Sequence, residues 1–417
     1  MEFQNKTPFF ILQLYEETRV LERQYLQEVS DIFSTAQYLN AYKYNLKNVF
    51  MYLQESHISE IKSFIKNQIL DESTTFLILL AEKTAPDLSE LVKELNSLNV
   101  SFIGGIFPSL ISGKTHQETG VIIQSLSHAH KPIVIGNLEK PTTHLRSISI
   151  PETKDKLTQL ILVDGIAKNV SHFLFELYNT FGNSVNYLGC GAGSISLESK
   201  PSLITNEGIF KDAAIICLLD MKSELGVRHG WKNIEGPFVA TKTEGNTIHE
   251  LNWEPAFDFY KKLIHNHSGE EIEKDLFLNI SKSYPFGIYK EESEFIVRDP
   301  IIADGSSITC IADVPENTIL YLLTSDKKNL LNAAGSTFKL TAPIIQKAQT
   351  GLVFDCISRA LFLGQDFKKE LTAVYHSFQK YAPDIQPEGA LSLGEIALNG
   401  QGNLEFFNKT LVTGILY

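Results

Sequence analysis

The run Thr75-Phe76-Leu77-Ile78-Leu79-Leu80 and the glycine-terminated run Asn99-Val100-Ser101-Phe102-Ile103-Gly104-Gly105 decide the predicted fold. Each is a short apolar stretch of the length and composition of a buried strand. Between them, residues 88–98 have helical spacing of apolar residues and follow Pro86-Asp87, a helix start signal. After a loop, residues 119–126 predict another strand. The predicted order is therefore strand, helix, strand ending in glycine, loop, strand.

The same order occurs a second time further along the chain. Residues 159–163 predict a buried strand, residues 169–181 a helix, Ser184 to Gly191 a strand ending in glycine, and residues 213–219 a final strand. We interpret this as an internal repeat, which would place two glycine-bearing strand ends in equivalent positions beside a shared cleft. The alternative is that any α/β chain alternates in this way.

The length of the chain predicts more than one domain. Single hydrophobic cores stop growing at about 250–300 residues, and this chain has 417. Hydrophobic residues make up 43% and charged residues 21%, as in compact globular proteins. We predict an α/β protein with two mixed-sheet domains, of which the N-terminal one contains the repeat. Residues 1–45 are expected to be an N-terminal extension.

Charge and targeting signals limit the functions that the chain can have. The formal net charge of −12 disfavours binding to nucleic acid or to a membrane surface, since both need clustered Lys and Arg. The first residues lack the basic start of a signal peptide, and the longest apolar run is too short to span a bilayer. We therefore expect a cytoplasmic protein.

The four cysteines predict neither a disulfide framework nor a zinc site. They stand far apart, without a C-x-x-C pair or a His at ligand spacing. His265 and His267 also lack a partner fixed by the sequence. No metal and no cofactor are expected. The loop Gly189-Cys190-Gly191-Ala192-Gly193 superficially resembles a dinucleotide loop, but no helical pattern follows it, as phosphate binding would require.

The second half predicts hairpins and two strand–helix units. Residues 351–355 predict a strand that runs into a helix from about Ile357 to Tyr381. Residues 390–398 and 403–417 predict a closing hairpin around Asn399-Gly400-Gln401-Gly402.

A series of short motifs resembles the FIST family. At the junction of the two halves the motifs are His229-Gly230-Trp231, Glu244-Gly245-Asn246, Glu250-Leu251-Asn252, Pro255-Ala256 and Tyr260. The C-terminal half continues with Pro285-Phe286-Gly287, Val297-Arg298-Asp299-Pro300, Cys356-Ile357-Ser358-Arg359, Gly394-Glu395-Ile396 and Asn408-Lys409-Thr410. The order and spacing of the motifs, over about residues 45–417, make the resemblance specific.

The resemblance implies a sensory module of signal transduction. It implies a FIST N-terminal domain at residues 46–240 and a FIST C-terminal domain at residues 241–417. It also implies binding of small ligands such as amino acids, and a signalling partner protein that carries the output. FIST domains also occur beside an F-box in ubiquitin-ligase adaptors, so a protein-interaction module without a small ligand is the alternative.

Cys356 and Arg359 are the first candidates for a ligand site. Cys356 ends an apolar strand at a predicted helix start, and Arg359 follows one turn later. A helix N-terminus and a guanidinium both stabilise a thiolate, whereas Asp355 opposes it. Three hypotheses stay open: Cys356 contacts a ligand, Cys356 is a nucleophile, or Cys356 is a buried core residue beside an Arg359 that is paired with a carboxylate. A cysteine-dependent enzyme is the weakest of these, because no His has matching context, and we expect no enzyme activity.

Glu395 is the second candidate, because strand alternation places it on an apolar face with Leu391, Leu393 and Ala397. A carboxylate there needs a cation or hydrogen-bond donors. The hairpin register brings the region from Phe406 to Asn408 opposite Glu395. We therefore predict a ligand site of Cys356, Arg359, Glu395, Asn408, Arg298 and Gly394. A structural buried ion pair is the alternative.

Overall fold

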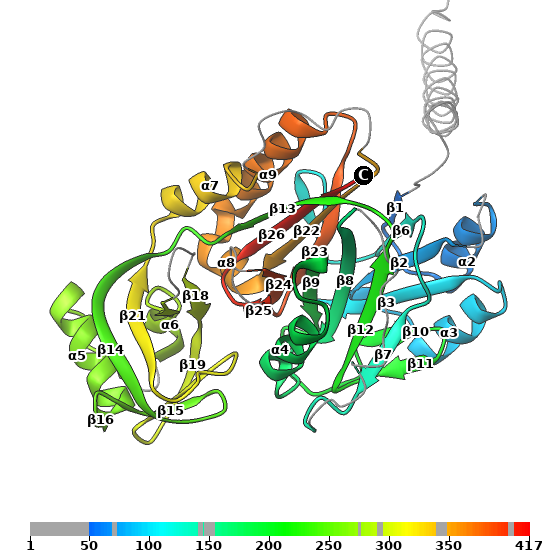
Figure 1. Ribbon diagram of the computed structural model, residues 1–417. Helices are drawn as coiled ribbons and strands as arrows, with labels where there is room; N and C mark the ends of the chain where they lie inside the picture. Colours follow the sequence, from blue (N-terminus) through cyan, green and yellow to red (C-terminus); the bar gives the residue numbers. More distant parts are fainter. Residues whose placement is uncertain are drawn as a thin grey trace, which may run out of the picture. The chain divides into compact units, whose positions relative to one another are not determined.

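A computed structural model of the chain describes residues 50–68, 73–140, 145, 155–273, 277–289, 295–338, 348–398 and 404–417 (Figure 1). The predicted N-terminal extension, residues 1–45, lies outside these residues. Along the described parts, no helix is long and apolar enough to cross a membrane.

The fold is mixed α/β, as predicted, and the repeated unit of the N-terminal half is confirmed. A third copy of the unit, which the sequence did not reveal, lies in the C-terminal half. Unit 1 contains β2 (Thr75–Ala81), α3 (Leu88–Asn96), β3 (Ser101–Phe107) and β6 (Val121–Leu126). Unit 2 contains β8 (Leu157–Asp164), α4 (Val170–Phe181), β9 (Val185–Ala192) and β12 (Ala213–Leu219). Unit 3 contains β22 (Thr350–Cys356), α8 (Ile357–Leu363), α9 (Phe367–Tyr381), β23 (Pro387–Ser392) and β26 (Leu411–Leu416).

The strand pairing is the same in all three units. The first two strands are parallel, and the last strand is antiparallel to the first. One further strand covers the outer edge of each last strand: β1 (Phe50–Leu53), β7 (Ile133–Gly136) and β13 (Ser223–Arg228). A helix α2 (Ile58–Lys66) follows β1.

A glycine at one register position shows that the units are equivalent. In each unit it lies beside a residue in the middle of the first strand: Gly104 beside Ile78, Gly189 beside Ile161, Gly389 beside Val353. A Cβ added to these glycines would lie 2.2, 2.1 and 1.7 Å from the carbonyl oxygen of that neighbour. Only glycine allows the two strands to approach so closely.

The three units exchange hairpins in a ring. The hairpin of unit 1, β4 (Ser109–Ser112) and β5 (Thr115–Gln117), pairs with β23 of unit 3. The hairpin of unit 2, β10 (Leu203–Thr205) and β11 (Gly208–Phe210), pairs with β3 of unit 1. The hairpin of unit 3, β24 (Glu395–Leu398) and β25 (Leu404–Phe407), pairs with β9 of unit 2. Sheets A, C and B, built on units 1, 2 and 3, are therefore each completed by another unit.

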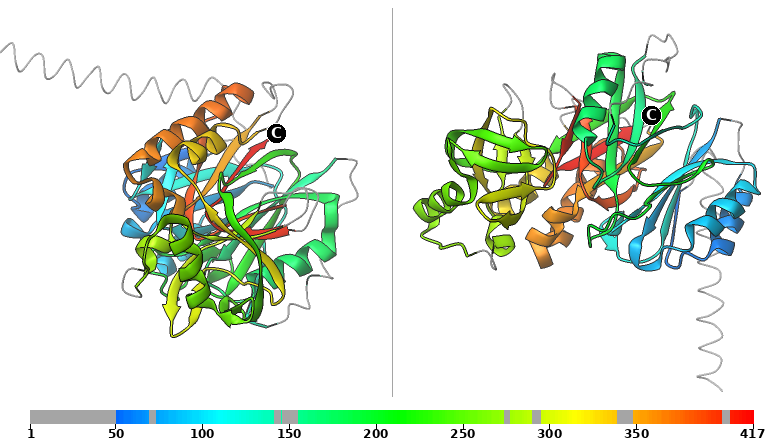
Figure 2. Two further views of the ribbon diagram at one scale, coloured as in Figure 1. Left: turned by 90° about the vertical axis from the view of Figure 1, so that its left-hand side faces the viewer. Right: turned by 90° about the horizontal axis from the view of Figure 1, so that it is seen from below.

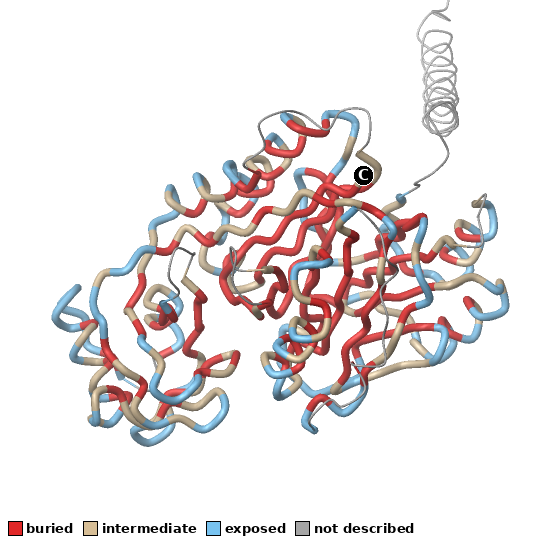
Figure 3. The backbone as a smooth tube through the Cα atoms, viewed as in Figure 1, coloured by how far each residue is buried: buried red, intermediate tan, exposed pale blue. Residues whose placement is uncertain are grey.

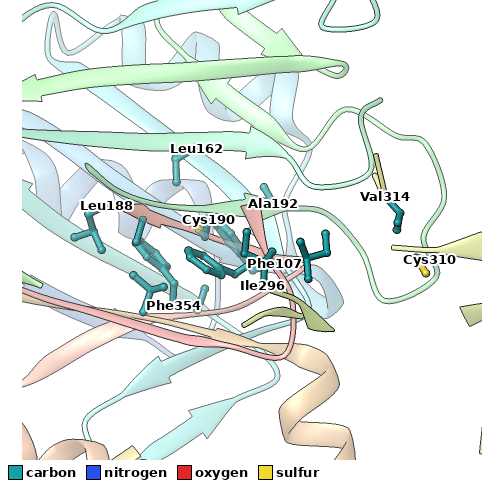
Figure 4. Packing of buried hydrophobic residues seen from close by; sticks show 14 of the residues in the cluster. Phe107, Leu162, Leu188, Cys190, Ala192, Ile296, Cys310, Val314 and Phe354 are labelled. Carbon is teal, nitrogen blue, oxygen red and sulfur yellow. The ribbon is translucent and has the colours of Figure 1, made fainter. Parts of the chain in front are cut away.

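One core joins the inner faces of the three sheets. It contains residues from each first strand, such as Leu77, Leu160 and Leu352, and Figure 4 shows part of it around Cys190. The outer faces pack instead against the helices of the same unit, α3, α4 and α9 (Figure 2). The first two strands of each unit are accordingly among the most deeply buried segments (Figure 3).

An insertion between β13 and β22 forms a fourth sheet, sheet D. Its strands are β14 (Lys232–Glu244), β15 (Thr247–Leu251), β16 (Glu254–Pro255), β17 (Phe286–Ile288), β18 (Ile296–Arg298), β19 (Pro300–Asp304), β20 (Ser307–Cys310) and β21 (Thr318–Thr324). Helices α5 (Ala256–Ser268) and α6 (Phe277–Ser281) belong to it, and α7 (Lys327–Gly335) leads back to unit 3. We call residues 232–324 the sheet D lobe.

The predicted closing hairpin is confirmed where β24 pairs with β25, but its outer parts, β23 and β26, do not pair with each other. Its two predicted arms are each divided, into β23 and β24 and into β25 and β26, and the two halves of each arm join different sheets. Gly394, with φ of 155°, stands at the first break. The predicted register is confirmed, however, because Glu395 pairs with Phe407.

Glu388 on β23 makes the stability of this core depend on pH. It is buried, and its Oε1 accepts hydrogen bonds from Ser112 Oγ at 3.2 Å and Gln386 Nε2 at 2.7 Å. Burial raises the pKa of Glu388 from 4.5 to about 8. The folded protein therefore keeps this proton up to about pH 8, whereas the unfolded chain releases it near pH 4.5. This contribution to stability is complete below pH 4.5 and is lost as the pH rises to about 8.

We expect Glu388→Gln, which cannot titrate, to remove this part of the pH profile. Urea unfolding at a series of pH values measures it. Between pH 5 and pH 8, the unfolding free energy of the natural protein should fall by roughly 4 kcal/mol relative to that of the variant. Parallel profiles of the two proteins would contradict the prediction.

Candidate functional site

The six predicted site residues are all buried. Cys356 ends β22 and begins α8, which carries Arg359. Glu395 begins β24 directly after Gly394, and Asn408 follows β25. Arg298 ends β18 in the sheet D lobe.

Arg359 is held by a carboxylate of the protein. Its Nε and Nη2 donate to the two carboxylate oxygens of Glu370 on α9 at 3.1 and 2.8 Å, a bidentate pair. Its Nη1 donates to the carbonyl oxygens of His229 and, at 3.2 Å, Lys409. These four hydrogen bonds use most of the five N–H groups of a guanidinium. The charge of Arg359 is thus neutralised within the protein.

Glu395 lies in a buried acidic environment next to Cys356. Its two oxygens accept hydrogen bonds from Ser392 Oγ at 2.7 Å and from the Thr410 N–H at 3.3 Å. Burial raises the pKa of Glu395 well above its usual value, although these hydrogen bonds oppose the shift. Burial thus favours the neutral form of this carboxyl group, whereas the two hydrogen bonds favour the charged form.

The thiol of Cys356 is not activated. Burial and the neighbouring Glu395 raise its pKa, and the N–H groups of Lys409 and Ser358 offset this only in part. The thiolate that a helix start and Arg359 would favour is therefore not the stable form. This result corrects the expectation of a lowered pKa, and it weakens the cysteine-enzyme reading because the nucleophile is the thiolate.

Two further groups of this cluster have unused hydrogen-bonding capacity. Neither the oxygen nor the nitrogen of the Asn408 amide has a hydrogen-bond partner among the described residues, although the side chain is fully buried. Both carboxyl oxygens of Asp355 also lack a hydrogen bond there, although Oδ1 is 3.4 Å from Arg359 Nε. Burial and the nearby Glu370 raise the pKa of Asp355. Unpaired buried polar groups are costly, so each needs an explanation.

Arg298 and Gly394 both contact Phe406. Arg298 Nε donates to the carbonyl oxygen of Asp313 at 2.7 Å, and its Nη1 donates to that of Phe406 at 3.0 Å. The Phe406 ring packs on Gly394, where an added Cβ would lie 2.3 Å from the ring. Arg298 thus links Asp313 of the sheet D lobe to β25, the strand that carries Phe406.

A hollow of about 520 Å³ is lined in part by Phe406. Residues 165–171, at the start of α4, form one wall, and residues 244–247, His249 and 311–313 of the sheet D lobe form the other. The volume is in the range of small-molecule sites.

The two walls carry opposite charge preferences. The α4 N-terminus has no side-chain cap, because Asn169 donates instead to the carbonyl oxygen of Glu139 at 2.9 Å. Together with Lys168 it favours an anionic group. Asp313 lies opposite, and within the described chain its carboxylate has no hydrogen-bond partner. Burial raises the pKa of Asp313 while Arg298 lowers it, and this carboxylate would favour a cationic group.

The sequence did not single out Glu370, Lys409 or Asp313. Glu370 occupies an apolar face of α9 with Leu371 and Val374, a signal of the same kind as the one that revealed Glu395. Lys409 stands within a quoted motif but was not proposed for the site. No sequence pattern marked Asp313, because its position beside the hollow depends on how the sheet D lobe folds.

The described residues contain no cluster of His, Cys, Asp and Glu that could hold a metal. The four cysteines are free and buried.

Comparison with known families finds two matches in this chain. A family model described as FIST N domain matches residues 75–254, and one described as FIST C domain matches residues 256–398. Together they cover most of the chain. No curated protein was found to be similar. The division at residues 240 and 241 stays a prediction, and sheets B and C contain strands from both sides of it.

Proposed function

Because the chain belongs to the FIST family, whose domains are associated with sensing in signal transduction, we propose that it binds a small zwitterionic metabolite such as an amino acid. The observation that carries the proposal is the hollow between α4 and the sheet D lobe, with an uncapped helix start on one wall and the unpartnered carboxylate of Asp313 on the other. A ligand carboxylate at the first wall and an ammonium at the second would satisfy both.

The six predicted residues are proposed to form the buried layer beneath this ligand. Arg298 supports both Asp313 and Phe406 through hydrogen bonds. Gly394 leaves room for the Phe406 ring. Glu395, Asn408, Cys356 and Arg359 are fully or almost fully buried polar residues, with spare hydrogen-bonding capacity at Asn408. Movement of Phe406 would expose these residues to the ligand.

A separate signalling protein is proposed to carry the output, and the cytoplasm is the proposed location. Four free, buried cysteines suit a reducing compartment. The net charge of −12 disfavours nucleic acid and membrane surfaces as partners.

A protein-interaction module is the second candidate. Trp253 in the turn between β15 and β16 is 79% exposed and has a positive φ of 63°. Exposed tryptophans are enriched where proteins bind one another. A single stoichiometric partner in pull-downs, without any response to metabolites, would favour this function.

We expect one or more amino acids to raise the melting temperature of the purified protein. A ligand at one hundred times its Kd adds about 2.7 kcal/mol to the free energy of unfolding. Differential scanning fluorimetry against the twenty amino acids measures the effect. Asp313→Asn should abolish the shift, since it removes the negative charge from the wall of the lobe. The matched control, Asp304→Asn at the exposed end of β19 in the same lobe, should leave it unchanged. A flat panel, or equal shifts in both variants, would refute the proposal.

A further inference from the structure

Lys409 has a strained backbone and a fully buried side chain. It lies in the turn between β25 and β26, with φ of 50°. A residue other than glycine pays about 1 kcal/mol or more for this left-handed conformation. Lys is also among the residues least often buried completely, and here none of its surface is exposed. Both costs must be offset by contacts that the residue makes.

The ammonium group of Lys409 makes its contacts with the sheet D lobe. Nζ donates to the carbonyl oxygen of Lys282 at 3.0 Å, and it lies 3.2 Å from Asp299 Oδ2. Nζ also lies 5.2 Å from the centre of the Trp231 ring, within cation–π range. Asp299 directly follows Arg298, so two adjacent residues of the lobe bind the β25 strand and its turn.

The backbone of the same turn binds the predicted site. The Lys409 carbonyl oxygen accepts hydrogen bonds from Arg359 Nη1 at 3.2 Å and from Trp231 Nε1 at 3.3 Å. The next residue, Thr410, donates its N–H to Glu395 and accepts from the Cys356 N–H at 3.2 Å. The preceding residue is Asn408, whose amide has no partner within the described structure.

From these contacts we infer that Lys409 is a positioning residue of the proposed ligand site. Its ammonium holds the turn of residues 408–410 against Asp299 of the sheet D lobe. It thereby sets the place of Asn408 and of the N–H that binds Glu395, and it ties the sheet D lobe to the end of the hairpin of β24 and β25. The inference rests on the proposed function for its biological meaning. The contact between Lys409 and Asp299, which we call the latch, can be tested without a ligand.

The test measures local opening and the environment of Trp231. The chain has two tryptophans, so Trp253→Phe leaves the buried Trp231 as a single fluorescent reporter. In this background, Lys409→Met keeps the length of the side chain and removes the charge. We expect hydrogen exchange in residues 296–299 and 404–411 to become about tenfold faster or more, and exchange in residues 75–81 to stay unchanged. The emission of Trp231 should shift to longer wavelength.

Two further variants keep the test decisive. Lys409→Arg retains the charge and should restore most of the emission and exchange of the parent. Asp299→Asn should reproduce the local pattern of Lys409→Met, and the double variant should open little further, since the two residues act as one pair. Uniform acceleration in all sheets, an Arg variant that behaves like Met, or an Asn variant without local opening would overturn the inference. A Met variant that fails to fold leaves the Asp299→Asn result to decide.

The outcomes for the latch and for the ligand are separable. A negative amino-acid panel would refute the proposed function and leave the exchange result standing. Absence of local opening would refute the latch and leave the ligand proposal standing.

Discussion

A fragment that ends at residue 254, the end of the FIST N match, is expected not to fold. Sheet B would lose β22, β23 and β26 from its middle, and sheet C would lose β24 and β25 beside β9. The inner faces of sheets A and C would lose the partner residues of the shared core, such as Leu352 and Phe354. Since whole domains are stable by only about 5–15 kcal/mol, this loss should remove the entire free energy of unfolding.

Circular dichroism melting and dye binding to exposed apolar surface measure this outcome. The expected result is a fragment without a cooperative transition. Co-expression with residues 255–417 should restore a cooperative transition, because the two fragments together contain every strand of sheets A, B and C. Its midpoint should depend on the concentration of the fragments, since two chains must now associate. A monomeric fragment 1–254 with a sharp melting transition would contradict the exchanged-hairpin topology.

Glu370→Ala is expected to cost about 3–5 kcal/mol of stability, the usual effect of removing one partner of a buried ion pair. Both side chains of the pair are fully buried, and the variant leaves the Arg359 guanidinium without its bidentate partner. The carboxyl of Asp355 is nearby, but its Oδ1 lies 3.4 Å from Arg359 Nε and accepts no hydrogen bond. It therefore offers Arg359 one longer contact in place of the bidentate pair.

Urea unfolding of the purified variants measures this cost. The matched control is Asp366→Ala, which removes two ion pairs, with Lys327 and Lys369 and both at 2.7 Å, in a partly exposed position. We expect a far smaller effect, since solvent screens such pairs. The double variant Arg359→Met, Glu370→Leu should recover much of the loss because no charge is then left unpaired. Similar losses for Glu370→Ala and Asp366→Ala would show that Arg359 has another way to be neutralised.

Much of the site could be predicted from the sequence, but not the partner of each residue. Glu395 was recognised from alternation, and its position opposite Phe407 was expected from the hairpin register, because both depend on residues close in sequence. For Arg359, the sequence did not show whether the guanidinium binds a carboxylate of the protein or a ligand. The answer, Glu370, lies on the next helix beyond the turn at Gly364, whose geometry fixes which carboxylate reaches the guanidinium.

The third unit escaped detection for a related reason. Its glycine, Gly389, was placed just outside a predicted strand, and a long insertion separates β13 from β22. The strand order of the unit is still that of units 1 and 2. Close approach of two parallel strands requires the glycine, so the register position, which only the structure gives, identifies the repeat.

Local patterns along the chain were enough to predict the strand and helix order of two units, the burial of Glu395 and the family. The folded structure was needed to show which sheet each hairpin completes, which carboxylate neutralises Arg359, and where a hollow forms. These depend on contacts between residues up to about three hundred positions apart, such as Glu388 with Ser112. Local propensity carries no information about contacts of that kind, since side-chain packing across the whole core selects among them.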